Sequence, residues 1–149
     1  MNAWLLAPAA LQAVVMLGDE LHFHRRRGLP RWERWGHPLD TASVLACYGV
    51  ALLAPPVSPF TVVYAALVVV SCLLVTKDEF IHARRCSAAE HHLHAILFLL
   101  HPVVLAAAFT LWMEGSRRAL GALFALTLVF GVHQLVFWNV PWMRRFHAR

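Results

Sequence analysis

The chain has 149 residues, of which 60% are hydrophobic and only 14% are charged. Soluble domains carry about 25% charged residues, so this composition excludes an ordinary soluble domain and predicts one integral membrane domain over residues 1–149. The net charge of +5 comes from short arginine clusters. No long basic helix suits a DNA groove, which excludes nucleic acid as a partner.

Apolar runs of membrane-spanning length predict an all-α fold, an up-and-down bundle of five transmembrane helices. The runs cover residues 2–25, 39–54, 60–85, 87–113 and 119–138. A proline-rich segment, residues 55–59, separates the second helix from the third, because proline lacks an N–H and restricts the residue before it. Pro141 is expected to disturb the last turn of the fifth helix.

Arginines gather in the loops on one side of these helices. That side carries "RRRGLPRWER", "HARRC" and the C-terminal "MRRFHAR", whereas the other side carries the bare N-terminus, "PPVSP" and "EGSRR". Short cytoplasmic loops are enriched in Lys and Arg. We therefore expect the N-terminus outside and the C-terminus in the cytosol, in a bacterial inner membrane or its equivalent, although Arg117 and Arg118 run against the rule.

Acids and histidines concentrate toward the cytosolic ends of the helices. Of the eight acids only Glu114 lies on the outer side, and none of the ten histidines is expected beyond mid-membrane. An up-and-down bundle brings the polar ends of the first four helices into one layer. Ionisable groups are costly near hydrocarbon, so such a layer indicates function.

Within this layer, acids and histidines recur three or four residues apart, a spacing that puts two side chains on one helix face. The pairs four apart are Glu20–His24, Asp78–His82 and Glu90–His94, and the pairs three apart are Asp19–His22, Glu79–His82 and His91–His94. Deeper or flanking positions add His37, Asp40, His101 and His133. The acids of the third helix thus offer two alternative partners for one histidine.

We predict that this layer holds a metal centre. The expected ligands are Glu20, His24, Glu79, His82, Glu90 and His94. Further candidates, as ligands or as groups that orient them, are Asp19, His22, Asp40, Asp78, His91, His101 and His133. Carboxylates can bridge a pair of divalent ions while imidazoles complete each coordination sphere, so two ions are expected. Mixed O/N donors favour iron, with manganese or zinc as alternatives.

The cluster resembles two classes of di-iron protein. Its histidines are similar to those of the histidine-motif lipid desaturases and hydroxylases of membranes. Its carboxylates resemble those of ferritin-type bundles, which use one Glu from each of two helices and E-x-x-H from each of two others. Glu79–His82 matches that motif and Glu20 could be a lone Glu, whereas Glu90–His94 departs from it as E-x-x-x-H. The H-x-x-H-H boxes of desaturases are not reproduced in order.

The resemblance implies an iron-dependent oxidoreductase that acts on a membrane lipid or isoprenoid-like substrate with electrons from a donor protein. Arg26, Arg84 and Arg85 are expected to meet anionic lipid headgroups. Neither a catalytic residue beyond the ligands nor an oligomeric state follows from the residues.

Other interpretations stay open. Zinc in the same layer would activate water for the hydrolysis of a lipid amide or ester. A small metal or proton transporter is a non-enzymatic alternative, although the outer halves of the helices are almost wholly apolar. A haem bound by His101 and His133 is a further possibility. The layer could also be a structural polar network that joins the helices.

Several residues have local structural roles as alternatives to ligation. The segment "SAAE" forms a capping box, with Ser87 as N-cap and Glu90 three residues later. Asp40 or Thr41 is expected to cap the second helix, and Glu33 to be a surface ion-pair partner. The scattered cysteines predict neither a disulfide framework nor a thiolate metal site; they are Cys47, Cys72 and Cys86.

Overall fold

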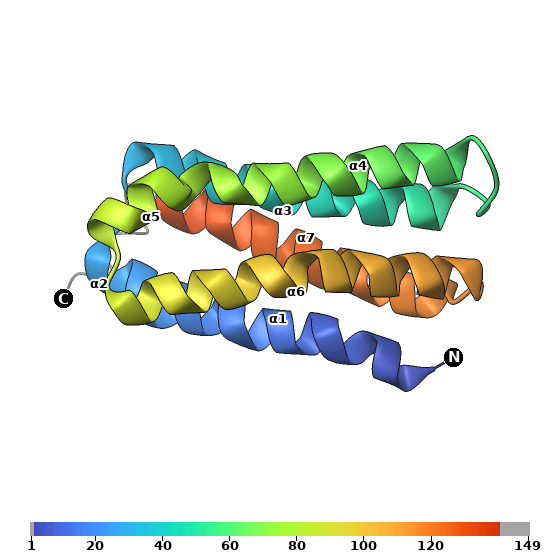
Figure 1. Cartoon of the computed structure of the whole chain (residues 1–149), viewed down its shortest axis with the longest axis horizontal. Helices are drawn as coiled ribbons and strands as arrows, with labels where there is room; N and C mark the ends of the chain where they lie inside the picture. The colour runs from blue at the N-terminus through green and yellow to red at the C-terminus, as the bar shows by residue number, and fades with distance from the viewer. Residues whose placement is uncertain (1, 141–149) are drawn as a thin grey trace.

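The computed structural model describes residues 2–140 of the chain. These residues form helices and no strand. Five long helices run up and down along one axis and are joined by short turns (Figure 1). Two predictions fall outside the described residues: the effect of Pro141 on the last turn, and the contribution of the arginines of the C-terminal tail to the orientation.

Two of the long helices pass through turns of non-α geometry. The first consists of the 3₁₀ turn η1 (Ala3–Leu6), α1 (Ala7–Gly18), the π turn η2 (Asp19–His24) and α2 (Arg25–Arg27). The third consists of α4 (Phe60–Leu74), the 3₁₀ turn η3 (Val75–Asp78) and α5 (Glu79–Arg85). The other long helices are α3 (Arg31–Leu53), α6 (Ala88–Met113) and α7 (Arg117–Asn139).

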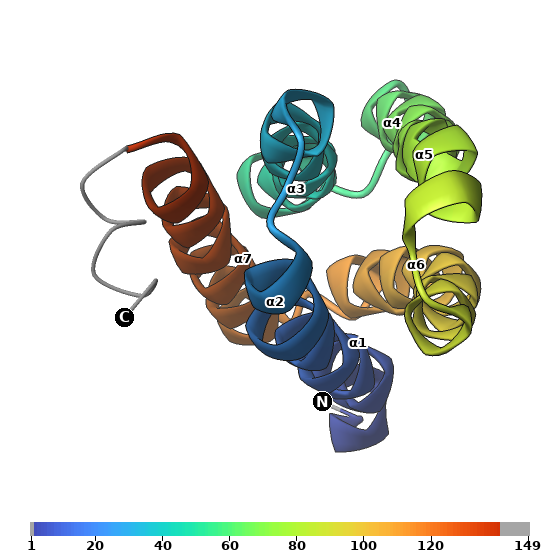
Figure 2. The same ribbon diagram turned by 90° about the vertical axis from the view of Figure 1, so that its left-hand side faces the viewer.

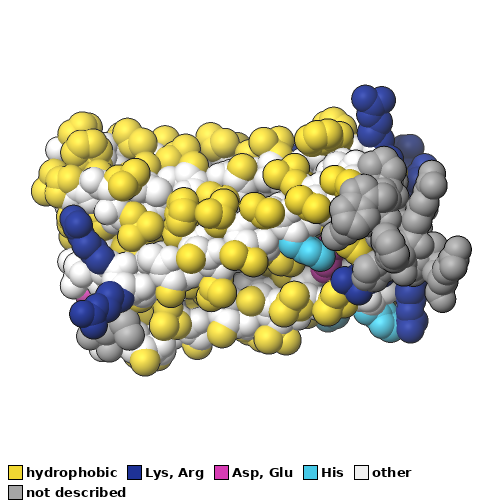
Figure 3. All heavy atoms as spheres, turned by 180° about the vertical axis from the view of Figure 1, so that it is seen from behind, with side chains coloured by type: hydrophobic (Ala, Val, Ile, Leu, Met, Phe, Trp, Pro, Cys, Tyr) yellow, Lys and Arg dark blue, Asp and Glu magenta, His cyan; other side chains and the backbone are white. Residues whose placement is uncertain are grey.

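Four long helices, all except α3, are long and apolar enough to cross a membrane. The all-helical bundle is thus confirmed, whereas the five predicted spans are supported for four helices only. The first turns of α3 carry Arg31, Glu33 and Arg34, which make that helix too polar at one end. On the face seen in Figure 3, apolar side chains cover the middle of the bundle and cationic ones lie at both ends.

The helix α3 begins earlier than the sequence predicts. Its first residue is Arg31 and not Leu39, so Pro38 lies inside the helix. The predicted start rests on the point where the apolar run begins, whereas the polar residues before that run are helical as well. The expected capping roles of Asp40 and Thr41 are wrong, because both residues lie in the helix interior.

A side chain from α7 compensates for the internal proline. Pro38 lacks the N–H that would bond the carbonyl of Arg34, four residues earlier. The amide nitrogen of Asn139 donates to that carbonyl at 3.3 Å. The helix therefore continues through Pro38 without leaving this carbonyl unpaired.

The helices pack side by side around the bundle axis (Figure 2). The helix α3 lies between α4 and α7, while α6 packs against α1 and also contacts α3, α4 and α7. The turn between α2 and α3 and the turn between α5 and α6 lie at the same end of the bundle (Figure 1). This end also holds the polar residues of the predicted layer.

The apolar core fills the bundle toward the opposite end. Leu105, Leu111 and Leu120 are fully or almost fully buried there. Polar side-chain atoms within this core are paired to the backbone: the Tyr64 hydroxyl donates to the carbonyl of Leu105 at 2.7 Å. The Trp112 indole donates to the carbonyl of Ala54 at 2.9 Å. Such pairing is needed because unpaired polar atoms are costly away from water.

The close contact between α3 and α7 yields a test of the packing. A Cβ added at Gly131 would lie 2.9 Å from Cγ2 of Thr41, whereas a Cβ at Gly121 in the same helix meets nothing within 4 Å. We expect Gly121→Ala to stabilise the protein by up to about 1 kcal/mol through helix propensity. Gly131→Ala should instead destabilise it by about 1 kcal/mol or more, because Thr41 is stiff. Thermal unfolding in detergent measures both; equal effects would contradict the packing.

Candidate metal centre

Ionisable side chains are buried together at the end of the bundle where α2 turns into α3. Each is at most 4% exposed, and the set comprises Asp19, Glu20, His24, Glu33, Asp78, His82, Glu90 and His94. Acids and histidines are almost never buried unless they are paired. The predicted polar layer therefore exists in the structure, and its contacts decide what it can do.

One pattern accounts for most of the layer: an acid and a histidine four residues apart, contributed by four different long helices. The pairs are Glu20–His24, Glu33–His37, Asp78–His82 and Glu90–His94. Residues at this spacing share a helix face, so each helix presents one carboxylate and one imidazole toward its neighbours. Of the two alternatives in the third helix, the structure buries Asp78 with His82 and leaves Glu79 at the surface.

The π turn η2 brings a second acid of the first helix to the same histidine. A π turn bonds residues five apart, and Oδ2 of Asp19 lies 3.1 Å from Nε2 of His24. Oε2 of Glu20 lies 3.2 Å from Nδ1 of the same ring. The predicted partner of Asp19, His22, is exposed instead. The π turn thus turns two consecutive carboxylates inward where a regular helix would separate them.

Glu20 is also held by α7. The indole N–H of Trp138 donates to Oε1 of Glu20 at 2.6 Å, and Nε2 of His133 lies 3.8 Å from the same oxygen. Because Glu20 contacts Nδ1 of His24, this arrangement fixes the ring and directs its Nε2 toward Asp19. Glu20 therefore orients a candidate ligand.

The 3₁₀ turn η3 brings a lysine and an acid against α3. Lys77 Nζ donates to Oδ2 of Asp40 at 2.6 Å and to Oδ2 of Asp78 at 2.9 Å. Gly36 allows this approach, because a Cβ there would lie 2.9 Å from Cε of Lys77. Lys77 thus forms a cationic bridge between carboxylates of two helices, a role that no motif predicts.

Arg27 forms a second cationic bridge. Its guanidinium donates to both carboxylate oxygens of Glu33, at 3.2 and 2.7 Å, and to Oε1 of Glu90 at 3.1 Å. The side chain of Glu33 is 0% exposed, which corrects its expected place at the surface. Ser87 does cap α6, accepting from the backbone N–H of Glu90 at 3.2 Å. The side chain of Glu90 nevertheless remains in the layer.

The described residues contain four groups whose nitrogen, oxygen or sulfur atoms lie within 4.8 Å of one another and so could hold a metal ion. The largest comprises Asp19, His24, Glu90 and His94, and a separate group comprises His37, Asp40 and Asp78. Two further groups are His24–Glu33–His37 and His82–Cys86–His94. The first two groups share no residue, and the group His24–Glu33–His37 contains one histidine from each of them.

Several buried atoms in these groups have no hydrogen-bond partner among the described residues. They are both ring nitrogens of His82, Nδ1 of His94, Nε2 of His24 and His37, and Oδ1 of Asp19, Asp40 and Asp78. Buried polar atoms normally have a partner. A structural network would satisfy its members, whereas imidazole nitrogens and carboxylate oxygens without partners are suited to ligating a cation.

The ionisation of His37 agrees with ligation. Burial lowers the pKa of this imidazole well below its ordinary value, and the positive charges of His24 and Lys77 lower the pKa further. A neutral imidazole has the free lone pair that a metal requires. The lowered pKa of His37 favours the neutral form, which is compatible with a role as a ligand.

Glu79 and His91 form a pair at the surface, apart from these groups. Oε1 of Glu79 lies 3.3 Å from Nε2 of His91, and their side chains are 40% and 44% exposed. This surface pair separates Glu79 from the four other predicted ligands that do enter the groups, which are His24, His82, Glu90 and His94. The E-x-x-H motif of the ferritin resemblance is therefore not the pair that the structure buries.

The deeper histidines have separate surroundings. Nε2 of His101 lies 2.9 Å from Oγ of Ser71, which lies 2.7 Å from Oγ of Ser43. His133 stacks on Phe137, with ring centroids 5.3 Å apart. His101 is thus paired within the core, and His133 is half-exposed beside the layer.

Three members of the layer were not predicted from the sequence: Glu33, Lys77 and Cys86. The available signal was the recurrence of an acid and a histidine four apart, which includes Glu33 and His37 once α3 is extended through Pro38. Cys86 lies four residues after His82 in the same way.

No family model, curated protein or solved structure matches the chain.

The two carboxylates on Arg27 yield a test of the layer as a stabilising unit. Arg27→Met should destabilise the protein by about 2 kcal/mol or more, because removing one partner of a buried ion pair leaves the other charge unpaired. Arg26→Met changes the same charge at an exposed neighbouring position and should shift stability by less than about 0.5 kcal/mol. Chemical or thermal unfolding in detergent measures the difference, and similar losses would contradict it.

Proposed function

We propose that the protein is a membrane metalloenzyme that oxidises a lipid-like substrate with dioxygen, and that its polar layer would hold two divalent ions, iron in the leading case. The observation that carries the proposal is the pair of non-overlapping ligand groups, Asp19–His24–Glu90–His94 and His37–Asp40–Asp78, with partnerless buried atoms in both. Glu20 and Glu33 flank these groups. Iron bound by such mixed O/N ligands supplies the chemistry of dioxygen activation.

The formal charges of the layer favour two divalent ions. Its acids are Asp19, Glu20, Glu33, Asp40, Asp78 and Glu90, and its salt-bridged cations are Arg27 and Lys77. These residues leave a formal excess of four negative charges, which two divalent cations would offset. Buried charges that are not compensated cost several kcal/mol each, so ion binding gives this layer a physical basis that a polar network alone lacks.

A membrane location fits a lipid-like substrate. Four helices can cross a membrane, and α3, which lies between α4 and α7, is proposed as the fifth span, with its polar first turns at the headgroup level. We propose that the end with the layer, which carries many arginines, faces the cytosol in accordance with the positive-inside rule, with the N-terminus outside. There a soluble donor protein could deliver electrons.

One observation favours a zinc-dependent hydrolase as the second candidate. Cys86 offers a sulfur atom beside His82 and His94, and zinc accepts thiolate and imidazole ligands readily. A nearby carboxylate would then serve as general base for the hydrolysis of a lipid amide or ester. The metal that the protein binds separates this candidate from the oxidoreductase.

Metal analysis of the detergent-purified protein, prepared without chelator or a nickel column, tests the proposal. We expect about two iron or manganese ions per chain, and oxidation of a component when lipid extracts are incubated with protein, reductant and air. Zinc in the same amount would favour the hydrolase. Absence of bound metal after reconstitution with iron, manganese and zinc would overturn both.

A matched pair of variants tests which residues hold the ions. His82→Ala removes a ring with two partnerless nitrogens that lies beside His94 of the largest ligand group. It should lower the metal content by about half or more, since loss of a residue that orients a ligand typically costs tenfold or more in affinity. Glu79→Ala, in the same helix but half-exposed and paired with His91, should leave the metal content unchanged. Elemental analysis measures both; a loss in Glu79→Ala alone would reverse the assignment.

A further inference from the structure

A basic hollow opens at the end of the bundle that contains the polar layer. A cavity of about 490 Å³ is lined by Arg27, Gly28, Leu29, Pro30 and Arg85. A neighbouring cavity of about 350 Å³ is lined by His22, Phe23, Arg26, Arg27, Arg85, Ser87 and Glu90. Both share Arg27 and Arg85, so we treat them as two sides of one site, the arginine pocket.

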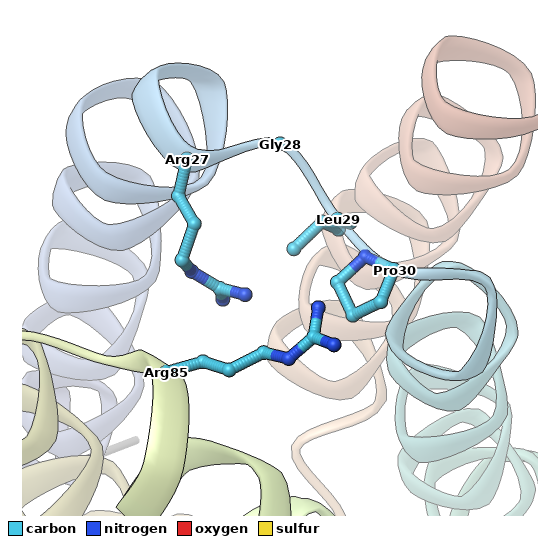
Figure 4. Close-up of a pocket in the computed structure, with 5 residues that line it drawn as sticks. All are labelled: Arg27, Gly28, Leu29, Pro30 and Arg85. Carbon is cyan, nitrogen blue, oxygen red and sulfur yellow. The ribbon is translucent and has the colours of Figure 1, made fainter.

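Two helix ends form this pocket by directing arginines at each other. Arg27 extends from the end of α2 and Arg85 from the end of α5, and their guanidinium groups approach below the Gly28–Pro30 turn (Figure 4). The turn requires Gly28, whose φ of 72° lies in the left-handed region that glycine adopts at no steric cost. The backbone therefore closes over the guanidinium groups.

The two arginines differ in how they are neutralised. Arg27 is bound by Glu33 and Glu90, whereas Arg85 has no hydrogen bond or ion pair among the described residues. An unpaired guanidinium that faces another one is repelled by it, and an anion between them would offset that repulsion. The planar fork of arginine matches the oxygens of a phosphate group in a bidentate manner.

The lining also contains apolar groups. Leu29 and Pro30 lie on one side and Phe23 on the other, and the membrane-crossing helices continue from this end. A ligand that fits both features has an anionic head and an apolar chain. Glu90 connects the pocket to the metal centre, because it lines the pocket and belongs to the group of Asp19, His24 and His94.

We propose that the arginine pocket binds the phosphate group of an anionic amphiphile, with Arg85 as its principal contact. The amphiphile as substrate rests on the proposed function, whereas recognition of the phosphate rests on the pocket alone. The sequence-based prediction gave Arg26, Arg84 and Arg85 one shared role at the membrane surface. The geometry separates Arg84 from the other two, since Arg26 and Arg85 line the pocket and Arg84 lines neither cavity.

Calorimetric titration of the full chain in nonionic detergent tests this assignment with three probes: dioctanoyl phosphatidic acid, uncharged dioctanoylglycerol and inorganic phosphate. Arg85→Gln should weaken binding of the phosphatidic acid about tenfold, through loss of charge-assisted hydrogen bonds. Arg85→Lys keeps the charge without the fork and should lose less. Arg84→Gln, the adjacent exposed arginine, is the matched control and should change affinity less than about twofold.

The outcomes separate the pocket from alternatives. Equal losses in Arg85→Gln and Arg84→Gln would show general attraction to a basic surface and overturn the proposal, as would equal binding of the uncharged lipid. Competition by inorganic phosphate as strong as by the lipid would support the phosphate site and assign its source as the free anion. Metal content, measured on the same samples, should not change; lipid binding that depends on Arg85 in a protein without metal would uphold the pocket and refute the proposed function.

Discussion

Negative charge buried at one end of an apolar bundle is the constraint to which the rest of the molecule is adapted. The long helices meet there through carboxylates, and apolar packing elsewhere could not offset their desolvation. Arg27 ties Glu33 to Glu90, and Lys77 ties Asp40 to Asp78. Each of these cations joins different helices, so the same ion pairs compensate the buried charge and hold the helix ends together.

The backbone departs from regular α-helix where these charges lie. The π turn over Asp19–His24 and the 3₁₀ turn over Val75–Asp78 both occur at the polar layer, and α3 passes through Pro38 close to it. Non-α turns within helices cost hydrogen-bond geometry and are frequent at functional sites. Here the π turn and the 3₁₀ turn direct side chains into the polar layer that a regular helix would place on other faces.

The fold was largely predictable because hydrophobic length is a strong signal, and the turns at residues 55–59 and 114–118 follow from proline and charge. The polar layer was predictable too, since an up-and-down bundle brings helix ends together. Two local rules failed. The second helix was predicted to begin where its apolar run begins, yet α3 begins at Arg31 and continues through Pro38, where Asn139, distant in sequence, bonds the carbonyl of Arg34. The pairing of Asp19 with His22 assumed α-helical spacing, whereas the π turn joins Asp19 to His24. Both outcomes depend on tertiary contacts or on backbone geometry that spacing alone does not contain.

Arg27 has a consequence that extends past its own ion pairs. Its guanidinium holds Glu90, a residue of the largest ligand group, and it also lines the arginine pocket. A cation on Glu90 would compete with Arg27 for the carboxylate and release guanidinium N–H groups toward the pocket. An anion in the pocket would in turn draw Arg27 away from Glu90. By thermodynamic linkage, a cation on Glu90 and an anion in the arginine pocket would each strengthen the binding of the other by the same factor. The occupancies of the ligand group and of the pocket would therefore rise together.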